Sequence, residues 1–350
     1  MEPVNILGKG AMACVYNFQH KKYGEVACKQ YHFTPTFDYK SYFRKEIENL
    51  RKLNHENIIK ILGVEFNTSS LYLELMDINL FKFIKLNNDI NKQAQYSIIQ
   101  QICCGLSYIH NNKMIHRDLK TSNILISSLH RIHTVKICDF DSCIEYNGSN
   151  SALTQTRGYR CPEQLLNIVY NESADLFSLG CIIFEILVGT QLFNDDLAYR
   201  DCDSDSDSDC DCDCDCDDLY NFTKIRYYGK SFKINERDEL LNKLRSVIGM
   251  IPCKYYESSP IITNMEQINS FPYYKITSIK KIANPVIINE ELIDIIESCL
   301  SYDMIKRPSA QYIIDKLQHI DVDEKVDEKV DEQYDIETNP TNRNKRRKVA

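Results

Sequence analysis

Residues 115–126 constrain the fold more strongly than any other stretch of this chain. They read Ile-His-Arg-Asp-Leu-Lys-Thr-Ser-Asn-Ile-Leu-Ile, so a run of polar side chains lies between two apolar runs. This pattern predicts a tight loop held between two buried strands. The loop carries a carboxylate at Asp118, an ammonium group at Lys120 and an amide at Asn123, which makes it a candidate catalytic loop.

Three stretches before this loop have clear periodicities. Residues 6–16 hold two glycines between apolar residues, which predicts a hairpin with a tight turn. Residues 25–30 alternate, which predicts a strand that carries Lys29. Residues 39–53 have apolar side chains at helical spacing, and the predicted helix carries Glu46.

Two further stretches follow the loop. Residues 135–141 read as an apolar strand that ends in Asp139, Phe140 and Asp141. Residues 154–163 read Thr-Gln-Thr-Arg-Gly-Tyr-Arg-Cys-Pro-Glu. A set of unrelated polar turns does not explain why all of these stretches occur in this order and at this spacing.

Together, these stretches resemble the motifs of eukaryotic protein kinases. Residues 116–123 resemble the catalytic loop H-R-D-L-x-x-x-N, and residues 139–141 resemble D-F-G. Residues 6–16 resemble the glycine-rich loop, and residues 25–30 resemble the V-A-I-K strand. Residues 154–163 resemble the T-R-x-Y-R-A-P-E segment of the group that includes cyclin-dependent, MAP, Clk and SR-protein kinases. A lysine at position 120 is typical of serine/threonine kinases.

The resemblance implies an active site that uses ATP and Mg²⁺ for phosphoryl transfer. Asp118 would accept the proton of a serine or threonine hydroxyl, and Lys120 would contact the transferred phosphate. Asn123 and Asp139 would supply oxygen ligands to Mg²⁺, a cation that prefers hard oxygen donors. Lys29 would contact the α- and β-phosphates. The implied catalytic residues are Asp118, Lys120, Asn123, Lys29 and its ion-pair partner Glu46.

The resemblance also implies a nucleotide site at the glycine-rich hairpin, whose backbone N–H groups would approach the phosphates. The implied nucleotide contacts are Leu7, Gly8, Lys9, Gly10, Ala11, Met12, Ala13, Cys14, Val15, Ala27, Lys29 and Leu125. Ala13 replaces the third glycine of the motif, which predicts a looser phosphate clamp. Asp141 replaces the glycine of D-F-G, which predicts less backbone freedom in the segment that follows.

The implied fold class is α+β, a bilobal protein kinase fold. Residues 1–75 are expected to form the small lobe, an antiparallel β-sheet with one helix. Residues 76–320 are expected to form a larger, mainly helical lobe with an acidic low-complexity insert at residues 201–218. Residues 321–350 are expected to form a disordered, charged tail.

The resemblance further implies contacts in the larger lobe. Glu163 is expected to form a buried ion pair with Arg307, and Asp175 to bond the backbone of the catalytic loop. Thr156 is expected to contact the catalytic loop, while Thr154 is the expected site of regulatory phosphorylation.

Composition bounds the partners and the location. The formal net charge of -8 argues against direct nucleic-acid binding. Residues 201–218 hold ten aspartates and no basic residue, which favours basic, Arg-rich protein substrates; a repeat without a role and soft-metal binding are the alternatives.

The basic cluster within residues 344–349 is either a nuclear import signal or a solvated charge run. With no secretory signal and no long apolar run, we expect a soluble, intracellular protein without membrane contact.

Two other functions remain open on this fold. A pseudokinase, which binds nucleotide or partners without efficient phosphotransfer, is favoured by Ala13 and Asp141 and opposed by the presence of every implied catalytic residue. A kinase of small molecules or lipids is opposed by residues 154–163, which shape a peptide platform in protein kinases. The sequence specifies neither the physiological substrate nor whether a partner subunit is required.

Overall fold

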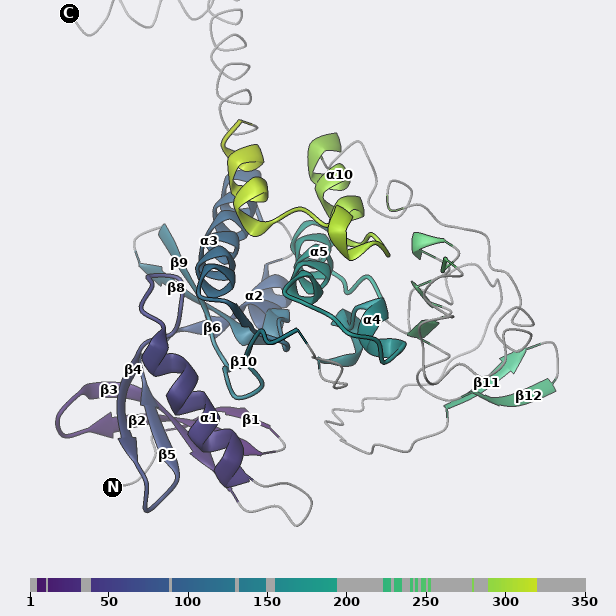
Figure 1. Cartoon of the computed structure of the whole chain (residues 1–350). Coiled ribbons are helices and arrows are strands. Elements are labelled where there is room, and N and C mark those ends of the chain that lie inside the picture. Colours follow the sequence, from purple (N-terminus) through teal and green to yellow (C-terminus); the bar gives the residue numbers. More distant parts are fainter. Residues whose placement is uncertain are drawn as a thin grey trace, which may run out of the picture.

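The computed structural model has a smaller lobe built on an antiparallel β-sheet and a larger, mainly helical lobe, and Figure 1 shows their elements. The described residues are 5–10, 12–32, 39–87, 90–129, 132–148, 155–193, 223–227, 230–234, 240–241, 243–244, 247–249, 251–252, 279 and 289–319. Ala11, Thr154, the acidic insert at residues 201–218 and the tail at residues 321–350 lie outside the described residues.

The small lobe is built on an antiparallel sheet of five strands in the order β1-β2-β3-β5-β4. The strands are β1 (Asn5–Lys9), β2 (Ala13–His20), β3 (Gly24–Tyr31), β4 (Ile61–Glu65) and β5 (Ser70–Leu73). Gly24 begins β3 with a φ of 76°, a left-handed conformation that glycine adopts without steric cost and that closes the hairpin from β2. The predicted sheet is therefore confirmed.

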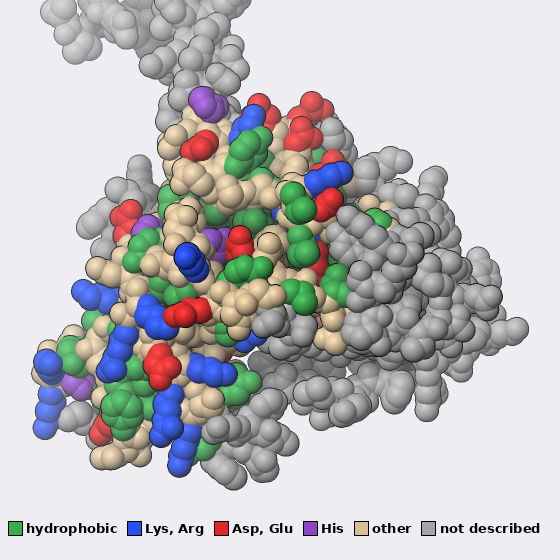
Figure 2. Space-filling model, in the orientation of Figure 1, with side chains coloured by type: hydrophobic (Ala, Val, Ile, Leu, Met, Phe, Trp, Pro, Cys, Tyr) green, Lys and Arg blue, Asp and Glu red, His purple; other side chains and the backbone are tan. Residues whose placement is uncertain are grey.

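Helix α1 (Tyr39–Lys52) packs on this sheet through an apolar stripe. Phe43, Ile47 and Leu50 are buried at spacings of four and three residues, as expected for one face of a helix. The exposed side chains of α1 are mainly Lys and Arg, and Figure 2 shows basic side chains over this part of the small lobe. Two polar side chains, Glu46 and Asn49, are nevertheless buried on the inner face. They need polar partners, because burying an unpaired polar group is costly.

The large lobe is mainly helical. The helices that the described residues define from end to end are α2 (Leu80–Leu86), α3 (Lys92–Asn111), α4 (Pro162–Leu165), α5 (Ser173–Val188), α10 (Glu290–Cys299) and a last helix at residues 310–319. Helix α5 is the centre of the core, since its side chains are buried from Ser173 to Ile186. A Cβ at Gly180 would stand 2.7 Å from the Cβ of Cys299, so the close packing of α5 on α10 requires glycine there.

The remaining strands are short and form three small sheets. They are β6 (Ile78–Asn79), β8 (Ile124–Leu129) and β9 (Ile132–Ile137) in one sheet, β7 (Met114–Ile115) with β10 (Ile144–Glu145), and β11 (Thr223–Tyr227) with β12 (Lys230–Ile234). The β11–β12 hairpin is not predicted from the sequence. Strands β7 and β8 enclose the candidate catalytic loop, as predicted. None of the helices in the described ranges has both the length and the apolar character needed to cross a membrane.

Candidate active site

The Asp118 carboxylate is fixed by donors on both of its oxygens. Oδ1 accepts hydrogen bonds from the backbone N–H of Thr156 at 3.0 Å and from Thr156 Oγ1 at 2.8 Å. Oδ2 lies 3.0 Å from Lys120 Nζ and 3.1 Å from Asn123 Nδ2. The predicted contact between Thr156 and the catalytic loop is thus confirmed. The loop brings three candidate residues together because a 3₁₀ turn at Thr121–Asn123 folds the amide of Asn123 back onto Asp118.

Lys120 links the catalytic loop to the segment before α4. Its Nζ donates to Thr156 Oγ1 at 2.7 Å in addition to its contact with Asp118. Burial disfavours the charged ammonium group, but the Asp118 carboxylate outweighs this effect and raises the pKa of Lys120. Lys120 is therefore a cation at neutral pH, placed beside a carboxylate and a hydroxyl. Such a group can meet an anionic phosphate while the carboxylate meets an alcohol.

Lys29 on β3 contacts carboxylates from two other elements. Its Nζ lies 2.9 Å from Glu46 Oε2 on α1 and 2.6 Å from Asp139 Oδ1, just beyond β9. Burial disfavours the ammonium charge, yet Asp139 and Glu46 outweigh it and hold the pKa of Lys29 well above its usual range. Glu46 is fully buried, whereas Glu48 lies on the exposed face of α1. The predicted ion pair between Lys29 and Glu46 is confirmed.

Asp139 and Asn123 lie at the ends of neighbouring segments. The backbone N–H of Cys138 donates to the carbonyl oxygen of Asn123 at 2.9 Å, so Asp139 directly follows a residue bonded to Asn123. Burial opposes the charge of Asp139, but the Lys29 ammonium group outweighs it and lowers the pKa of Asp139 to about 2. The carboxylate is therefore ionised at neutral pH, and its side chain is 30% exposed.

This donor set fits Mg²⁺. A carboxylate and an amide oxygen are hard donors, and Mg²⁺ commonly takes only one or two protein ligands together with waters and phosphate oxygens. Within the described ranges, no group of three or more His, Cys, Asp or Glu side chains could hold a metal ion. The pair Asp139 and Asn123 would supply one or two of these protein ligands.

Most of the predicted nucleotide contacts belong to the five-stranded sheet of the small lobe, and one belongs to β8. Leu7, Gly8, Lys9, Gly10, Met12, Ala13, Cys14 and Val15 all belong to the β1–β2 hairpin, Ala27 to β3 and Leu125 to β8. A Cβ at Gly8 would meet no atom within 4 Å, so packing inside the chain does not require glycine there. Close approach of a ligand to the backbone gives a reason for it. Ala13 begins β2 opposite Tyr31 in extended backbone, where alanine is unstrained.

Two buried polar side chains support the site from the large lobe. Asp175 Oδ2 accepts the backbone N–H of His116 at 2.8 Å, and its Oδ1 accepts that of Arg117 at 2.9 Å. Glu163 Oε1 lies 2.6 Å from Arg307 Nη2, with both side chains fully buried. Both predicted contacts are confirmed.

Sequence reasoning missed the polar cluster around Asp141. Tyr31 donates to Glu46 Oε2 and lies 3.5 Å from Asp141 Oδ2, which is 3.8 Å from Lys29 Nζ. Asp141 is 8% exposed, and burial together with the charge of Asp139 raises its pKa to about 7. The residue in the place of the D-F-G glycine is thus a member of the buried cluster. The alternation of β3 gave a signal for Tyr31, which lies two residues after Lys29 and so on the same face.

Three residues beside the reacting groups have left-handed backbone although none is glycine. Their φ angles are 67° at Arg117, 69° at Asp139 and 61° at Gln155. Such conformations are uncommon for non-glycine residues and persist where surrounding contacts hold them. The buried amide of Gln155, for example, donates to Ser178 Oγ at 2.9 Å and accepts the backbone N–H of Cys161 at 3.2 Å. The sequence alone gave no sign of this role for Gln155.

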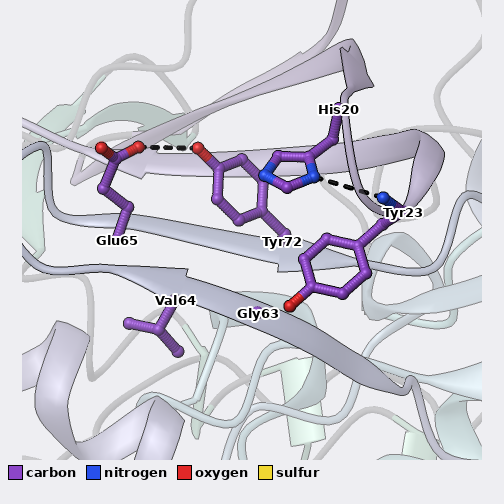
Figure 3. Close-up of a pocket in the computed structure, with 6 residues that line it drawn as sticks. All are labelled: His20, Tyr23, Gly63, Val64, Glu65 and Tyr72. Atoms are coloured by element: carbon purple, nitrogen blue, oxygen red, sulfur yellow. Dashed lines mark hydrogen bonds between the residues drawn. The ribbon is translucent and has the colours of Figure 1, made fainter.

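A pocket of about 290 Å³ lies on the small lobe, apart from these residues (Figure 3). It is lined by His20, Tyr23, Gly63, Val64, Glu65 and Tyr72. Tyr72 pairs with Cys28 and Leu71 with Lys29, so Tyr72 lies on the sheet face opposite Lys29. Figure 3 shows Tyr72 donating to Glu65, at 2.8 Å, and the Tyr23 backbone donating to His20. None of the predicted site residues lines this pocket.

Comparisons with known proteins agree with this geometry. A family model described as "Protein kinase domain" matches residues 1–317. The "Mitogen-activated protein kinase 5" of Oryza sativa subsp. indica is 35% identical over 205 residues, which cover 55% of this chain and 54% of that protein. The "Mitogen-activated protein kinase 2" of Pneumocystis carinii is 34% identical over 210 residues, which cover 55% of this chain and 58% of that protein. The chain thus spans little more than half the length of these curated relatives.

A solved structure has the same fold. One chain in the "Crystal Structure of the yeast RNA Pol II CTD kinase CTDK-1 complex" matches with a TM-score of 0.66 and 21% sequence identity. The match covers 89% of this chain and 90% of that one, so the likeness extends over both lobes.

Proposed function

The chain belongs to the protein kinase family, and from this premise we propose that it transfers the γ-phosphoryl group of ATP to serine or threonine hydroxyls of proteins. The observation that carries the proposal is the convergence of the candidate residues. Lys29 contacts both Glu46 and Asp139, so β3, α1 and the segment after β9 meet at one ammonium group. Asp118 lies on the catalytic loop between Lys120 and Asn123.

Asp118 is the proposed base. The hydroxyl of Thr156 donates to Asp118 Oδ1 at 2.8 Å, which supports the ability of this carboxylate to accept an O–H donor. A substrate hydroxyl in a similar position would lose its proton to Asp118 as it attacks phosphorus. Lys120 would contact the transferred phosphate, and its charge would offset the negative charge of the phosphoryl group.

Lys29, Asp139 and Asn123 are the residues proposed to hold Mg-ATP. Glu46 holds the Lys29 side chain, which would contact the α- and β-phosphates. Asp139 and Asn123 would hold Mg²⁺, which, when bound, supplies positive charge to the phosphate oxygens. The β1–β2 hairpin, Ala27 and Leu125 would contact the nucleotide.

The alternative, a pseudokinase, rested on Ala13 and Asp141, and no contact of the described residues favours it. Ala13 is unstrained in β2, and Asp141 joins the cluster without separating Asp139 from Lys29. The two relatives described above are mitogen-activated protein kinases, which also supports phosphotransfer to proteins.

We further propose that the kinase domain covers residues 1–320, divided into lobes at about residue 75, which the family match over residues 1–317 supports. The aspartate-rich residues 201–218 would raise the local concentration of basic substrates. The basic residues 344–349 would direct the protein to the nucleus. These two sequence features are tested by deleting each one and measuring peptide preference and cellular location.

The experiment that tests the proposed activity is a peptide-library phosphorylation assay with purified protein and Mg-ATP. We expect phosphate on serine and threonine, with a preference for basic residues around the acceptor. An Asp118→Asn variant is the control for a contaminating kinase. Lack of phosphotransfer by the wild-type protein, while it still binds ATP, would favour the pseudokinase instead.

A further inference from the structure

Asn49 is a buried amide on the inner face of α1. It lies between the buried apolar residues Ile47 and Leu50 and is itself 7% exposed. An apolar side chain would satisfy packing at this position, and a buried amide without partners would be costly. The site residues predicted from the sequence do not include Asn49, so its presence in the core needs its own explanation.

The amide of Asn49 spans a turn that follows the magnesium-ligand candidate Asp139. Asn49 Nδ2 donates to the carbonyl oxygen of Phe140 at 2.9 Å and to that of Cys143 at 2.9 Å. The backbone N–H of Cys143 donates to the same Phe140 carbonyl at 3.3 Å. One side chain therefore bonds both ends of the turn that contains Asp141 and Ser142.

Neighbouring residues on the same face of α1 reach the same segment. Glu46, Asn49 and Lys52 are spaced by three residues, so they lie along one side of the helix. Glu46 Oε1 accepts the backbone N–H of Phe140 at 3.3 Å, while its Oε2 contacts Lys29. Lys52 Nζ lies 2.6 Å from Glu145 Oε1 at the exposed end of the row. Helix α1 therefore contacts both Lys29, through Glu46, and the segment that begins at Asp139.

We propose that Asn49 is a positioning residue for phosphotransfer. By bonding both ends of the turn at residues 140–143, it keeps that turn against α1, so that Asp139 and Glu46 stay on the same ammonium group of Lys29. Asp141 lowers the backbone freedom of the turn relative to glycine, which makes a fixed arrangement of the turn easier to hold. The kinetic part of this inference rests on the proposed kinase function, whereas the structural part does not.

Asn57 provides a matched control. It is also a buried asparagine, 4% exposed, and its Nδ2 also donates to a backbone carbonyl, that of Val135 at 2.9 Å. Its second acceptor is Gln101 Oε1 at 3.2 Å. Asn57 therefore loses a similar set of contacts on substitution but does not touch residues 140–143. Asn49→Ala and Asn57→Ala should lower the melting temperature by comparable amounts.

The test follows the thiol of Cys143, which is buried when the turn is docked. Iodoacetamide labelling with mass spectrometry measures its rate of alkylation, and the fully buried Cys103 reports global unfolding in the same molecule. We define the alkylation ratio as the Cys143 rate in a variant divided by the Cys143 rate in the wild type. Each lost hydrogen bond favours the open turn by about fivefold, so this ratio should be roughly 25 in Asn49→Ala. Asn49→Ser, which keeps one hydroxyl donor, should give an intermediate ratio. Asn57→Ala should leave the ratio near one, while the Cys103 rate rises by a comparable factor in both alanine variants.

Steady-state kinetics supplies the second readout. We expect kcat to fall in Asn49→Ala by a factor of at most about 25, the shift in the docking equilibrium, with KM for ATP changed less, and to change less than twofold in Asn57→Ala. An unchanged alkylation ratio in Asn49→Ala would show that the amide only fills the core; if that variant does not fold, the ratio in Asn49→Ser decides. A raised ratio with wild-type kcat would overturn the positioning role. Wild-type protein without phosphotransfer would refute the proposed function, while the alkylation ratio would still test the docking of the turn.

Discussion

Replacing Arg307 with methionine is expected to destabilise the large lobe by about 3–5 kcal/mol, the usual cost of leaving a buried charge without its partner. Glu163 and Arg307 are separated by 2.6 Å and both are fully buried, so water cannot take the place of the lost guanidinium group. The substitution also removes hydrogen bonds to the carbonyl oxygens of Ser173, at 3.0 Å, and Ser301, at 2.8 Å. The Arg307 guanidinium also stacks over Phe177, with 5.2 Å to the ring centroid.

A double-mutant cycle separates the contribution of the ion pair to stability from the contributions of the other Arg307 contacts. Glu163→Gln combined with Arg307→Met replaces the ion pair by two neutral side chains, and such replacements of buried pairs are often close to neutral. We therefore expect the double variant to recover part of the stability lost in Arg307→Met. The unrecovered part measures the two carbonyl contacts and the contact with Phe177.

Urea unfolding followed by far-UV circular dichroism is the assay, because the chain contains no tryptophan for fluorescence. The midpoint should fall in Arg307→Met with an unchanged slope, since the change is in stability rather than in the surface exposed on unfolding. A loss below about 1 kcal/mol would refute the reasoning, because that is the range of an exposed ion pair. A double variant no more stable than Arg307→Met would show that the ion pair is not the source of the loss.

Three further predictions concern activity, pH and substrate choice. Lys29→Met should lower phosphotransfer by several orders of magnitude with unchanged circular dichroism, because phosphoryl transfer depends on positioned charge; activity near the wild-type level would remove Lys29 from the site. Burial raises the pKa of Glu185, so the folded state binds its proton more tightly than the unfolded state does, and the ionised group destabilises the fold as pH rises above the usual glutamate range. Glu185→Gln should therefore be more stable than wild type at pH 7. Thermal melts at a series of pH values should show that this difference in stability vanishes in acid. Deletion of residues 201–218 should raise KM for basic peptides at low salt only, and an equal KM across a salt titration would leave the insert without this role.

The catalytic loop and its partners could be predicted because their signals are local. The polar residues of the loop lie between two apolar runs, and those runs form β7 and β8. The resemblance to the kinase motifs implied Glu46 as the ion-pair partner of Lys29. The structure agrees, since Glu46 is fully buried against Lys29 while Glu48 is exposed.

Other parts of the site could not be predicted because their partners are distant backbone groups. Asn49 bonds carbonyl oxygens more than ninety positions along the chain, and nothing in the pattern of α1 identifies those acceptors. The only local sign is that Asn49 lies on the buried stripe, one helical turn from Glu46. Gln155 and Asp139 have left-handed backbone that local preference does not favour, so their conformations depend on tertiary contacts.

The central claim is that Asp118 is the base of a phosphotransfer site, and single-turnover kinetics tests it most directly. Purified wild-type and Asp118→Asn proteins would be mixed with Mg-ATP and a peptide selected from the library, with phosphopeptide formation followed over time. The amide keeps the shape of the carboxylate but is a far weaker base, so we predict a rate lower by about 10³-fold or more with a closely similar melting temperature. Phosphopeptide formation at a comparable rate in Asp118→Asn would contradict the account.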